Sequence, residues 1–476
     1  MKRLILAALM VAAFAVPSFA SVQNVKVSGD IDSTYLYRSN FDLGTAVPGL
    51  PVPSASISDL TQSVFLTQTR LRVDADLTDN VSTTVALINE RAWNTNTSAS
   101  SDIDLNLAYV TLREMLYSPL TVVVGRQAFH FGNSFIFDTA GTNNAALADS
   151  GISGIASDLI KQRAQDSIRA ILDYKPLTLQ LFYSTVANTA TAQKDSALNR
   201  DDINTFGANA TYELGDKMNT QVEGYFFAKR DRTTATIIGL GASGNAKADT
   251  IYLPGVRVST KPIEGLNVQG ELAWQTGTKV VSSATNLGAI HRDAMAVQFI
   301  ANYEIPALKE YKPMAQYVYT YTSGDHNPAN VAGSTQTSRE YYRAWDPFFE
   351  NQGGGSIYNT IFNLTNSHIH AVSLSATPIE DVTTKVTWTG LWLANDSTNP
   401  PYTTLALVQP GSAAVTPQVQ NGKSQLGNEI DWQTDYAYTE DVTIGANLGW
   451  YLPGDFFKTI NEKIASQAII HMNVNF

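Results

Sequence analysis

The sequence of 476 residues contains no cysteine. This absence excludes disulfide bonds, thiolate metal sites and a lipid anchor on an N-terminal cysteine. Positive charge is in the minority, because 32 Lys and Arg face 43 Asp and Glu and give a formal net charge of −11. Such an acidic balance disfavours nucleic acid as a partner, and it tolerates lipopolysaccharide as a neighbour only with divalent cations in between.

Long apolar runs are also missing, with one exception at the start of the chain. Lys2 and Arg3 precede the apolar run Leu4–Val16, and Ser18-Phe19-Ala20 supplies small residues where a signal peptidase cuts. This run is too short to span a bilayer, so residues 1–20 are predicted to be a secretory signal peptide that is removed. No later run reaches the length of about 18–20 apolar residues that a spanning helix needs.

The rest of the sequence consists of roughly eighteen stretches of about ten residues in which polar and apolar side chains alternate. The breaks between these stretches are by turns short and long. Antiparallel strands of a membrane barrel show this rhythm, with tight turns on the periplasmic side and longer loops outside. The short breaks are Thr78–Asn80, Met115–Pro119, Lys175–Pro176, Gly215–Met218, Lys261–Gly265, Glu304–Glu310, Thr377–Asp381 and Ala437–Asp441.

Period two assigns the two faces of each strand. In the first strand Val27 and Ile31 share one side, whereas Asp30 and Asp32 share the other. Charges occur in the middle of strands, where a soluble sandwich would need its core, so the pattern predicts an apolar face toward lipid and a charged face toward an enclosed lumen. No linker interrupts it, and we expect residues 21–476 to form a single all-β domain: a transmembrane, antiparallel, up-and-down β-barrel of about 18 strands.

Aromatic residues and the C-terminus support this prediction independently. Tyr174, Tyr212 and Tyr436 lie at the descending ends of strands with lipid-facing parity, where a barrel carries its aromatic girdle. The last strand alternates up to Phe476, an ending typical of barrels that are presented to the assembly machinery of the outer membrane. An even number of strands places both termini in the periplasm of a Gram-negative-type bacterium.

A barrel of this size encloses water unless a loop fills it. The long loop His130–Gln165 contains Ala145–Ile160, a stretch compatible with a short helix that lies either in the lumen or outside on the rim. Several inward positions carry charge and are candidate pore-lining or solute-binding residues. Alternatively, each of these residues only pairs along the wall and stiffens it. The cationic candidates are Arg70, Arg72, Arg126, Arg169, Arg257 and Lys385, and the acidic ones are Asp74, Glu429 and Asp431.

Arg126 is the difficult case, because both faces of Leu120–Gln127 are apolar and parity alone does not orient it. A bulge at Gly125 would be one way to turn it inward.

Catalysis and metal binding have weak support. An outer-membrane hydrolase needs a histidine with a Ser, Asn or Asp partner near the rim, and His130 with Ser134 is the nearest approach. His368 and His370 share a face but have no evident third ligand. We therefore expect no enzyme activity, no cofactor and no metal site.

Short motifs in consistent order resemble the alginate export family of outer-membrane porins. They begin at Gly125-Arg126-Gln127 with Gly132, continue through Tyr321-Thr322-Ser323-Gly324-Asp325 and Trp345–Phe349, and end with Gly427–Asp431 and Leu452–Asp455. The resemblance implies an 18-stranded monomeric barrel whose constricted, arginine-bearing lumen passes an acidic polysaccharide outward, with Arg126 facing that lumen. Where the family tends to have a second arginine after the motif glycine, this chain has Asn133-Ser134-Phe135.

These observations together predict an outer-membrane channel for passive diffusion or export of hydrophilic solutes, either carbohydrate-like molecules or an anionic polysaccharide such as alginate. The alternative is a plugged barrel that serves as a structural or adhesive surface protein. Predicted partners are outer-membrane lipid and lipopolysaccharide, the solute, and the barrel-assembly machinery that reads the strand ending at Phe476.

Overall fold

The computed structural model describes residues 24–41, 43, 61–93, 102–138, 152, 155–186, 203–232, 248–282, 287–325, 341–351, 354–395, 422–457 and 462–476. The predicted signal peptide, residues 1–20, lies outside the described residues. Within them, no helix is long and apolar enough to cross a membrane.

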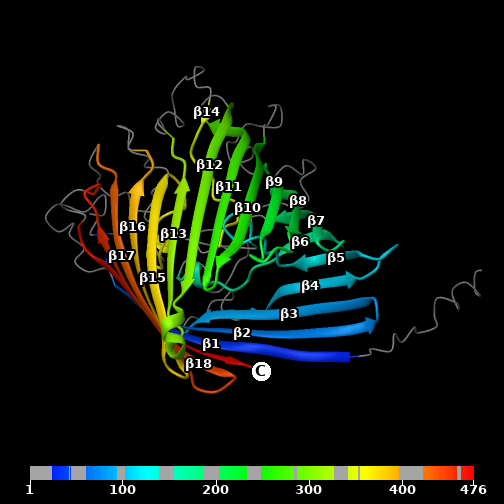
Figure 1. Ribbon diagram of the computed structural model, residues 1–476, viewed down its shortest axis with the longest axis horizontal. Helices are drawn as coiled ribbons and strands as arrows, with labels where there is room; N and C mark the ends of the chain where they lie inside the picture. Colours follow the sequence, from blue (N-terminus) through cyan, green and yellow to red (C-terminus); the bar gives the residue numbers. More distant parts are fainter. Residues whose placement is uncertain are drawn as a thin grey trace, which may run out of the picture.

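Nearly all of the described chain is β-structure (Figure 1). The strands are β1 Asn24–Ser39, β2 Thr61–Thr78, β3 Val81–Ala92, β4 Asp104–Leu112, β5 Leu120–Gln127, β6 Gln165–Asp173, β7 Leu177–Val186, β8 Ile203–Glu213, β9 Gln221–Asp231, β10 Asp249–Ile263, β11 Leu266–Ser282, β12 Leu287–Glu304, β13 Met314–Thr322, β14 Tyr341–Tyr342, β15 Ser367–Ile379, β16 Val382–Leu393, β17 Gln425–Ala437, β18 Val442–Pro453 and β19 Ala465–Asn475. The described helical segments are η1 Ser157–Leu159, η2 Pro306–Tyr311 and α4 Tyr358–Ile361.

Eighteen of these strands form a closed antiparallel barrel, which confirms the predicted fold. Each strand pairs with the next one along the chain, and β19 pairs with β1 to close the ring. The short β14 is the exception, because it lies in the connection between β13 and β15 and pairs in parallel with β12 at His291 and Arg292.

Gly29 lies at the closing seam, where β1 meets the C-terminus. The backbones of Gly29 and Phe476 exchange hydrogen bonds of 2.8 and 3.0 Å. A Cβ at Gly29 would lie 2.7 Å from the ring of Phe476 and 2.4 Å from the carbonyl oxygen of Arg70, so a side chain there would collide with both neighbouring strands.

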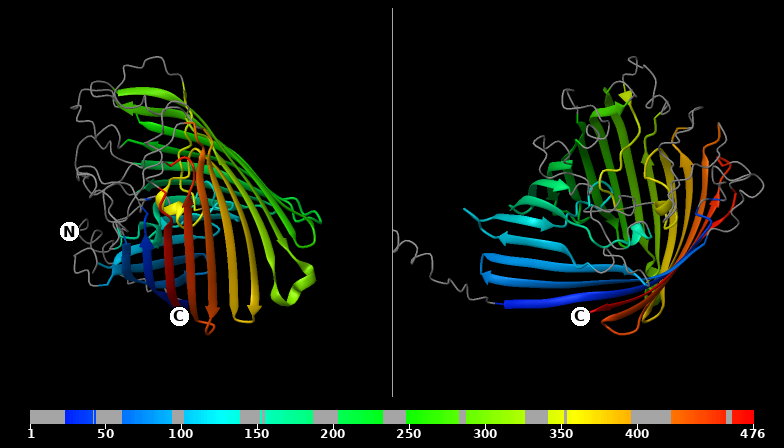
Figure 2. Two further views of the ribbon diagram at one scale, coloured as in Figure 1. Left: turned by 90° about the vertical axis from the view of Figure 1, so that its left-hand side faces the viewer. Right: turned by 180° about the vertical axis from the view of Figure 1, so that it is seen from behind.

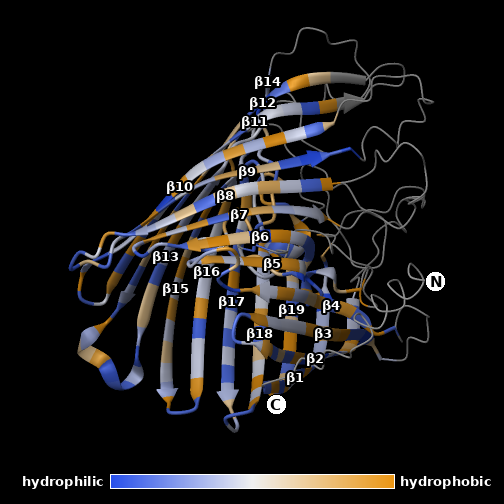
Figure 3. Ribbon diagram, turned by 90° about the vertical axis from the view of Figure 1, so that its right-hand side faces the viewer, coloured by the Kyte–Doolittle hydropathy of each residue, from blue (hydrophilic) through white to orange (hydrophobic). Residues whose placement is uncertain are grey.

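The alternation of side chains sorts the two faces as predicted. Val27 on the outer face is 58% exposed, whereas Asp30 on the inner face is 6% exposed. Leu71 and Ile444 also lie exposed on the outer surface. Bands of opposite hydropathy alternate along the strands in Figure 3. Such a surface, apolar on the outside, is the one that lipid requires.

Tight turns connect the strands at one end of the barrel. Residues 79–80 join β2 to β3, and Gly265 turns β10 into β11 with a φ of +79°. The turn between β12 and β13 is larger and carries η2. Tyr174, Tyr212 and Tyr436 are exposed at this end, in agreement with the predicted aromatic girdle. Long connections lie at the other end, except that β11 and β12 are joined over residues 283–286 alone.

Candidate functional site: the constricted lumen

The described parts of two connections lie inside the barrel (Figure 2). We call residues 128–164 inner loop 1 and residues 344–366 inner loop 2. Of inner loop 1, residues 128–138, 152 and 155–164 are described. Of inner loop 2, residues 344–351 and 354–366 are described.

The first part of inner loop 1 reaches a distant sector of the wall. Asn133 donates a hydrogen bond of 2.7 Å to the side-chain oxygen of Gln298 on β12, although the loop leaves the barrel wall at β5. Gly132 has a φ of +57°, and a Cβ there would lie 3.1 Å from a carboxylate oxygen of Glu223 and 3.2 Å from Cδ of Arg257. The motif glycine thus lets the loop approach the wall closely.

The last part of inner loop 1 is held against β1, β2 and β3. Arg38 on β1 forms an ion pair of 2.5 Å with Asp158, and the Arg38 side chain is 2% exposed. Lys161 lies 3.0 Å from Asp32, and its backbone N–H donates to Glu90 at 2.6 Å. The described residues of this loop therefore lie in the lumen rather than on the rim. Their helical part is η1, and residues 145–151, 153 and 154 of the predicted helix lie outside the described residues.

A cluster of phenylalanine rings joins the two inner loops to the wall. Phe137 is 0% exposed and packs against rings of both inner loops and of strands β7 and β9. The described rings of this cluster are Phe129, Phe131, Phe137, Phe182, Phe227, Phe348 and Phe349, with centroid separations between 4.9 and 6.4 Å. This cluster was not predicted from the sequence, although four phenylalanines within residues 129–137 are dense for a surface loop.

Backbone hydrogen bonds connect the two inner loops directly. Phe349 donates to the carbonyl of Ile136 at 3.2 Å, and Asp138 donates to the carbonyl of Phe349 at 2.7 Å. Thr360 in inner loop 2 also donates to Asp158 in inner loop 1 at 3.3 Å. The two inner loops consequently form one connected body inside the barrel.

Inner loop 2 is anchored near its start and in its middle. Near its start, Asp346 pairs with Lys229 on β9 at 2.7 Å and with Arg292 on β12 at 3.5 Å. Burial raises the pKa of Asp346, but the coulombic attraction of Lys229 and Arg292 outweighs burial and holds this pKa well below its usual value.

In the middle of inner loop 2, the backbone N–H groups of Ile357 and Tyr358 donate hydrogen bonds of 2.7 and 2.8 Å to Glu429 on β17, which is fully buried. Asp431 accepts the hydroxyl of Ser356 at 2.5 Å. The two predicted acidic residues thus hold a loop in place.

Register places the other predicted charged residues on the inner wall as well, apart from Arg126. Three of the cations are paired: Arg70 with Asp30 at 2.6 Å, Arg72 with Asp74 at 2.7 Å and Arg257 with Glu223 at 3.2 Å. Among the described residues, Arg169 and Lys385 have no ion-pair partner. Arg169 donates to the side-chain oxygen of Gln180 and lies 5.6 and 5.7 Å from the ring centroids of Phe129 and Phe131.

Arg126 does not lie in the lumen, in contrast to what the family resemblance implied. Its register partner on β6 is Asp166, which is on the outer face together with the exposed Ile168. The guanidinium donates to the carbonyl of Leu105 at 3.0 Å and lies 3.7 Å from the Asp166 carboxylate. Gly125 does have a φ of +125°, but the strand keeps its register there and does not turn Arg126 inward.

His130, Ser134 and Asp138 do come together, but not as a catalytic relay. The Ser134 hydroxyl and the Asp138 carboxylate both contact Nδ1 of His130, at 2.9 and 3.0 Å. A relay needs the serine on one ring nitrogen and the carboxylate on the other. Here they share one nitrogen, so the arrangement suits a loop bridge rather than an activated nucleophile.

His368 and His370 point outward from β15. Tyr319 and Tyr317 lie within hydrogen-bonding distance of their Nδ1 atoms, at 2.9 and 2.8 Å. The described residues contain no group of three or more His, Asp or Glu side chains that could hold a metal ion.

A polar cavity of about 360 Å³ remains between inner loop 2 and the wall formed by β12, β13 and β15–β18. Its lining is rich in side-chain amides and hydroxyls, with Lys385 and Asp431 as its charged members. The amide side chains are Gln298, Gln316, Asn359, Gln433 and Asn447.

A closed barrel with an apolar exterior and a polar, loop-constricted interior defines an outer-membrane channel for solutes. The sequence matches the family model for alginate export over residues 24–470, and the chain therefore belongs to the alginate export family. This match confirms the resemblance found in the sequence. A comparison with curated proteins finds no match.

Among solved structures, Pseudomonas aeruginosa OccK1 (OpdK) is similar with a TM-score of 0.55 and 10% identity, covering 96% of this chain and 99% of that chain. The structure of OpdK with vanillate has a TM-score of 0.53 and 10% identity, and the match covers 96% of this chain and 100% of that chain. OccK11 (OpdR) of the same organism has a TM-score of 0.52 and 9% identity, and the match covers 96% of each chain. At these identities the similarity establishes the fold alone.

Proposed function

We propose that this channel passes small, uncharged, hydroxyl-rich solutes by passive diffusion. The observation that carries the proposal is the amide-rich cavity between inner loop 2 and the wall. Amide groups both donate and accept hydrogen bonds, which suits sugar hydroxyls. The wall charges of Arg70, Arg72 and Arg257 are already compensated by neighbouring carboxylates, so their attraction for a charged solute is weakened.

A second candidate is export of an anionic polysaccharide. Membership in the alginate export family favours it, and so do Arg169 and Lys385, which have no carboxylate within ion-pair distance among the described residues. A polyanion needs a continuous series of such cations, whereas the inner wall alternates cations with carboxylates. We therefore rank this candidate second.

Liposome swelling with the purified, folded chain separates the two candidates. The panel contains neutral mono- and disaccharides, galacturonate, alginate oligomers and vanillate, with which OpdK was crystallised. We expect the neutral sugars to enter faster than acidic sugars of equal size. Faster entry of the acidic oligomers would reverse the ranking. No swelling and no single-channel current would instead favour a plugged barrel with a structural or adhesive role.

We further propose the orientation of the barrel and its route to the membrane. The tight turns and both termini face the periplasm, residues 1–20 are removed as a signal peptide, and residues 21–476 form one domain. The strand that ends at Phe476 is presented to the barrel-assembly machinery, and lipopolysaccharide surrounds the opposite end. The absence of catalysis is part of the same proposal, since the nearest Ser-His-Asp group lacks relay geometry.

A further inference from the structure

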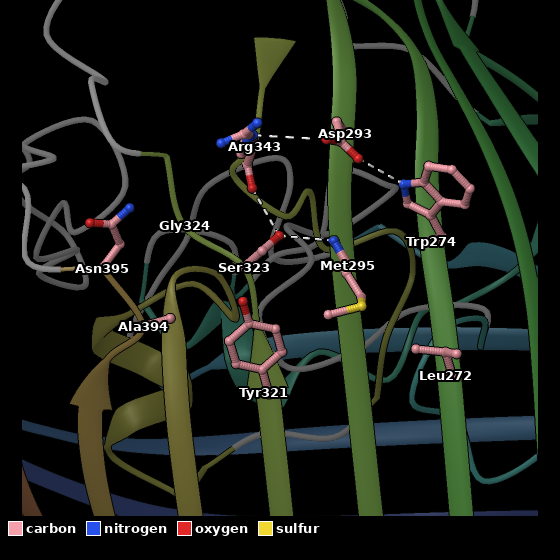
Figure 4. Close-up of a pocket in the computed structure, with 10 residues that line it drawn as sticks. All are labelled: Leu272, Trp274, Asp293, Met295, Tyr321, Ser323, Gly324, Arg343, Ala394 and Asn395. Atoms are coloured by element: carbon pink, nitrogen blue, oxygen red, sulfur yellow. Dashed lines mark hydrogen bonds and ion pairs between the residues drawn. The ribbon is translucent and has the colours of Figure 1, made fainter.

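The barrel wall has a notch on its outer face, at the end of the long loops (Figure 4). β13 ends at Thr322, whereas its neighbour β12 extends on to Leu287. The Tyr321–Asp325 motif marks the point where the chain leaves the wall. Asn366 packs closely against Gly324 at this point, because a Cβ on Gly324 would overlap its side-chain oxygen.

This notch is a groove of about 460 Å³ with a polar rim and an apolar floor. At the rim, Trp274 donates from Nε1 to Asp293 at 3.1 Å, and Nε of Arg343 lies 3.8 Å from the same carboxylate. Leu272 and Met295 line the floor and are 45% and 40% exposed on the outer surface. The groove is therefore outside the lumen and separate from the solute path.

We propose that this groove binds one glycolipid of the outer leaflet, of the lipopolysaccharide class. Asp293 and Asn395 are placed to bind sugar hydroxyls, Arg343 is placed to bind a phosphate, and the Trp274 ring offers a face for a sugar. An acyl chain would lie along Leu272 and Met295. The proposal rests on the orientation given above, in which the long loops lie outside the cell.

The floor is continuous with the membrane-facing surface, which is the main argument for a lipid. Below the groove, the ring of Tyr321 lies 4.9 Å from that of His368, and Tyr319 and Tyr317 continue this band downward. The hydroxyls of Tyr319 and Tyr317 lie within hydrogen-bonding distance of His368 and His370, so these two tyrosines present mainly ring surface to their surroundings. The surface thus changes from polar at the rim to apolar below the groove. A lipid with a polar head above and a flexible apolar chain below matches this change.

Native mass spectrometry of the full chain in detergent with Mg²⁺ tests the proposal. Rough lipopolysaccharide and phosphatidylglycerol are titrated separately. We expect one bound lipopolysaccharide, and we expect Trp274→Ala/Arg343→Ala to weaken it by about tenfold, the loss of one charge-assisted hydrogen bond. Trp450→Ala/Arg126→Ala is the matched control, because both residues also point outward on distant strands, and it should bind as the wild type does.

Other outcomes would overturn the proposal. These are unchanged binding by the groove variant, equal binding of phosphatidylglycerol by the wild type, or a lipid-free dimer that shields the groove. If the double variant does not fold, Met295→Trp fills the groove from an exposed position and should abolish binding. Sugar-induced swelling should be unchanged in every groove variant, so a failure here is distinguishable from a failure of the proposed solute path.

Discussion

Two arginines of the inner wall, Arg70 and Arg257, form ion pairs with the residue directly across the sheet. Arg70 and Asp30 are register partners on β2 and β1, and their side chains meet at 2.6 Å. Arg169 differs, because its register partner on β7 is Phe182 and its hydrogen-bond partner is the uncharged Gln180. No carboxylate among the described residues compensates the charge of Arg169, so this charge can attract or repel ions in the lumen.

Reversal of this charge should change ion selectivity. The Coulomb energy between unit charges ~7 Å apart in water is about 0.6 kcal/mol. Arg169→Glu shifts the energies of a passing anion and of a passing cation by about 1.2 kcal/mol each, in opposite directions, and should therefore lower the anion-to-cation permeability ratio by about fiftyfold. Arg126→Glu is the matched control, because this arginine lies on the outer face, and its selectivity should equal that of the wild type. Reversal potentials in planar bilayers under a low-salt gradient measure both. Equal ratios for Arg169→Glu and wild type would remove Arg169 from the solute path.

The orientation of Arg126 could not be predicted from the sequence. Leu120–Gln127 is apolar on both faces, so period two contains no information about which side chain points inward. The orientation comes from pairing with β6, where Asp166 and Ile168 face outward. Similarly, alternation assigned Arg70 and Asp30 to one face, but their contact depends on strand register, which the single sequence does not specify.

At the scale of elements, the strands were predictable and the inner loops were not. Each strand repeats a period-two pattern, and the turns recur at regular intervals, so many weak signals agree. The contacts of the inner loops join residues far apart in sequence, such as Ile136 with Phe349 and Asp158 with Thr360. No local sequence pattern encodes such pairs. The only local sign of burial was that phenylalanines recur two residues apart, at Phe129 and Phe131 and at Phe135 and Phe137.

We expect the phenylalanine cluster to stabilise the inner loops that narrow the lumen, but not to be needed for the folding of the barrel. Phe137→Ala removes a fully buried ring at a cost of about 3–5 kcal/mol to the loop body. We expect larger and noisier single-channel conductance and faster proteolysis within the inner loops. The heat-dependent gel migration of the folded barrel should be unchanged.

Phe226→Ala is the control for this experiment, because Phe226 is the sequence neighbour of cluster residue Phe227 but is 43% exposed on the outer face. Its conductance should remain that of the wild type. A wild-type conductance for Phe137→Ala as well would mean that the cluster does not limit the pore.

At the scale of the whole molecule, a rigid wall surrounds a loop body that is fastened to it at a few charged points. One of these points is Asp346, which ties inner loop 2 to Lys229 and Arg292. The barrel itself depends on the continuous strand ladder and not on this contact. A change of protonation at Asp346 should therefore alter the pore and leave the fold intact.

The pKa of Asp346 is held below its usual value of 3.8, which fixes the sign of the expected pH dependence. A carboxyl with a depressed pKa contributes stability that is present above the usual pKa and is lost as pH falls through the lowered one. Conductance should therefore stay constant from neutral pH down to the usual carboxyl range and rise only below it. Asp346→Asn should show the raised conductance already at neutral pH and lose most of the acid-induced step. An acid step of the same size in Asp346→Asn would assign the response to other carboxyl groups, and Asp293→Asn, which alters an outward-facing carboxyl, should retain the wild-type profile.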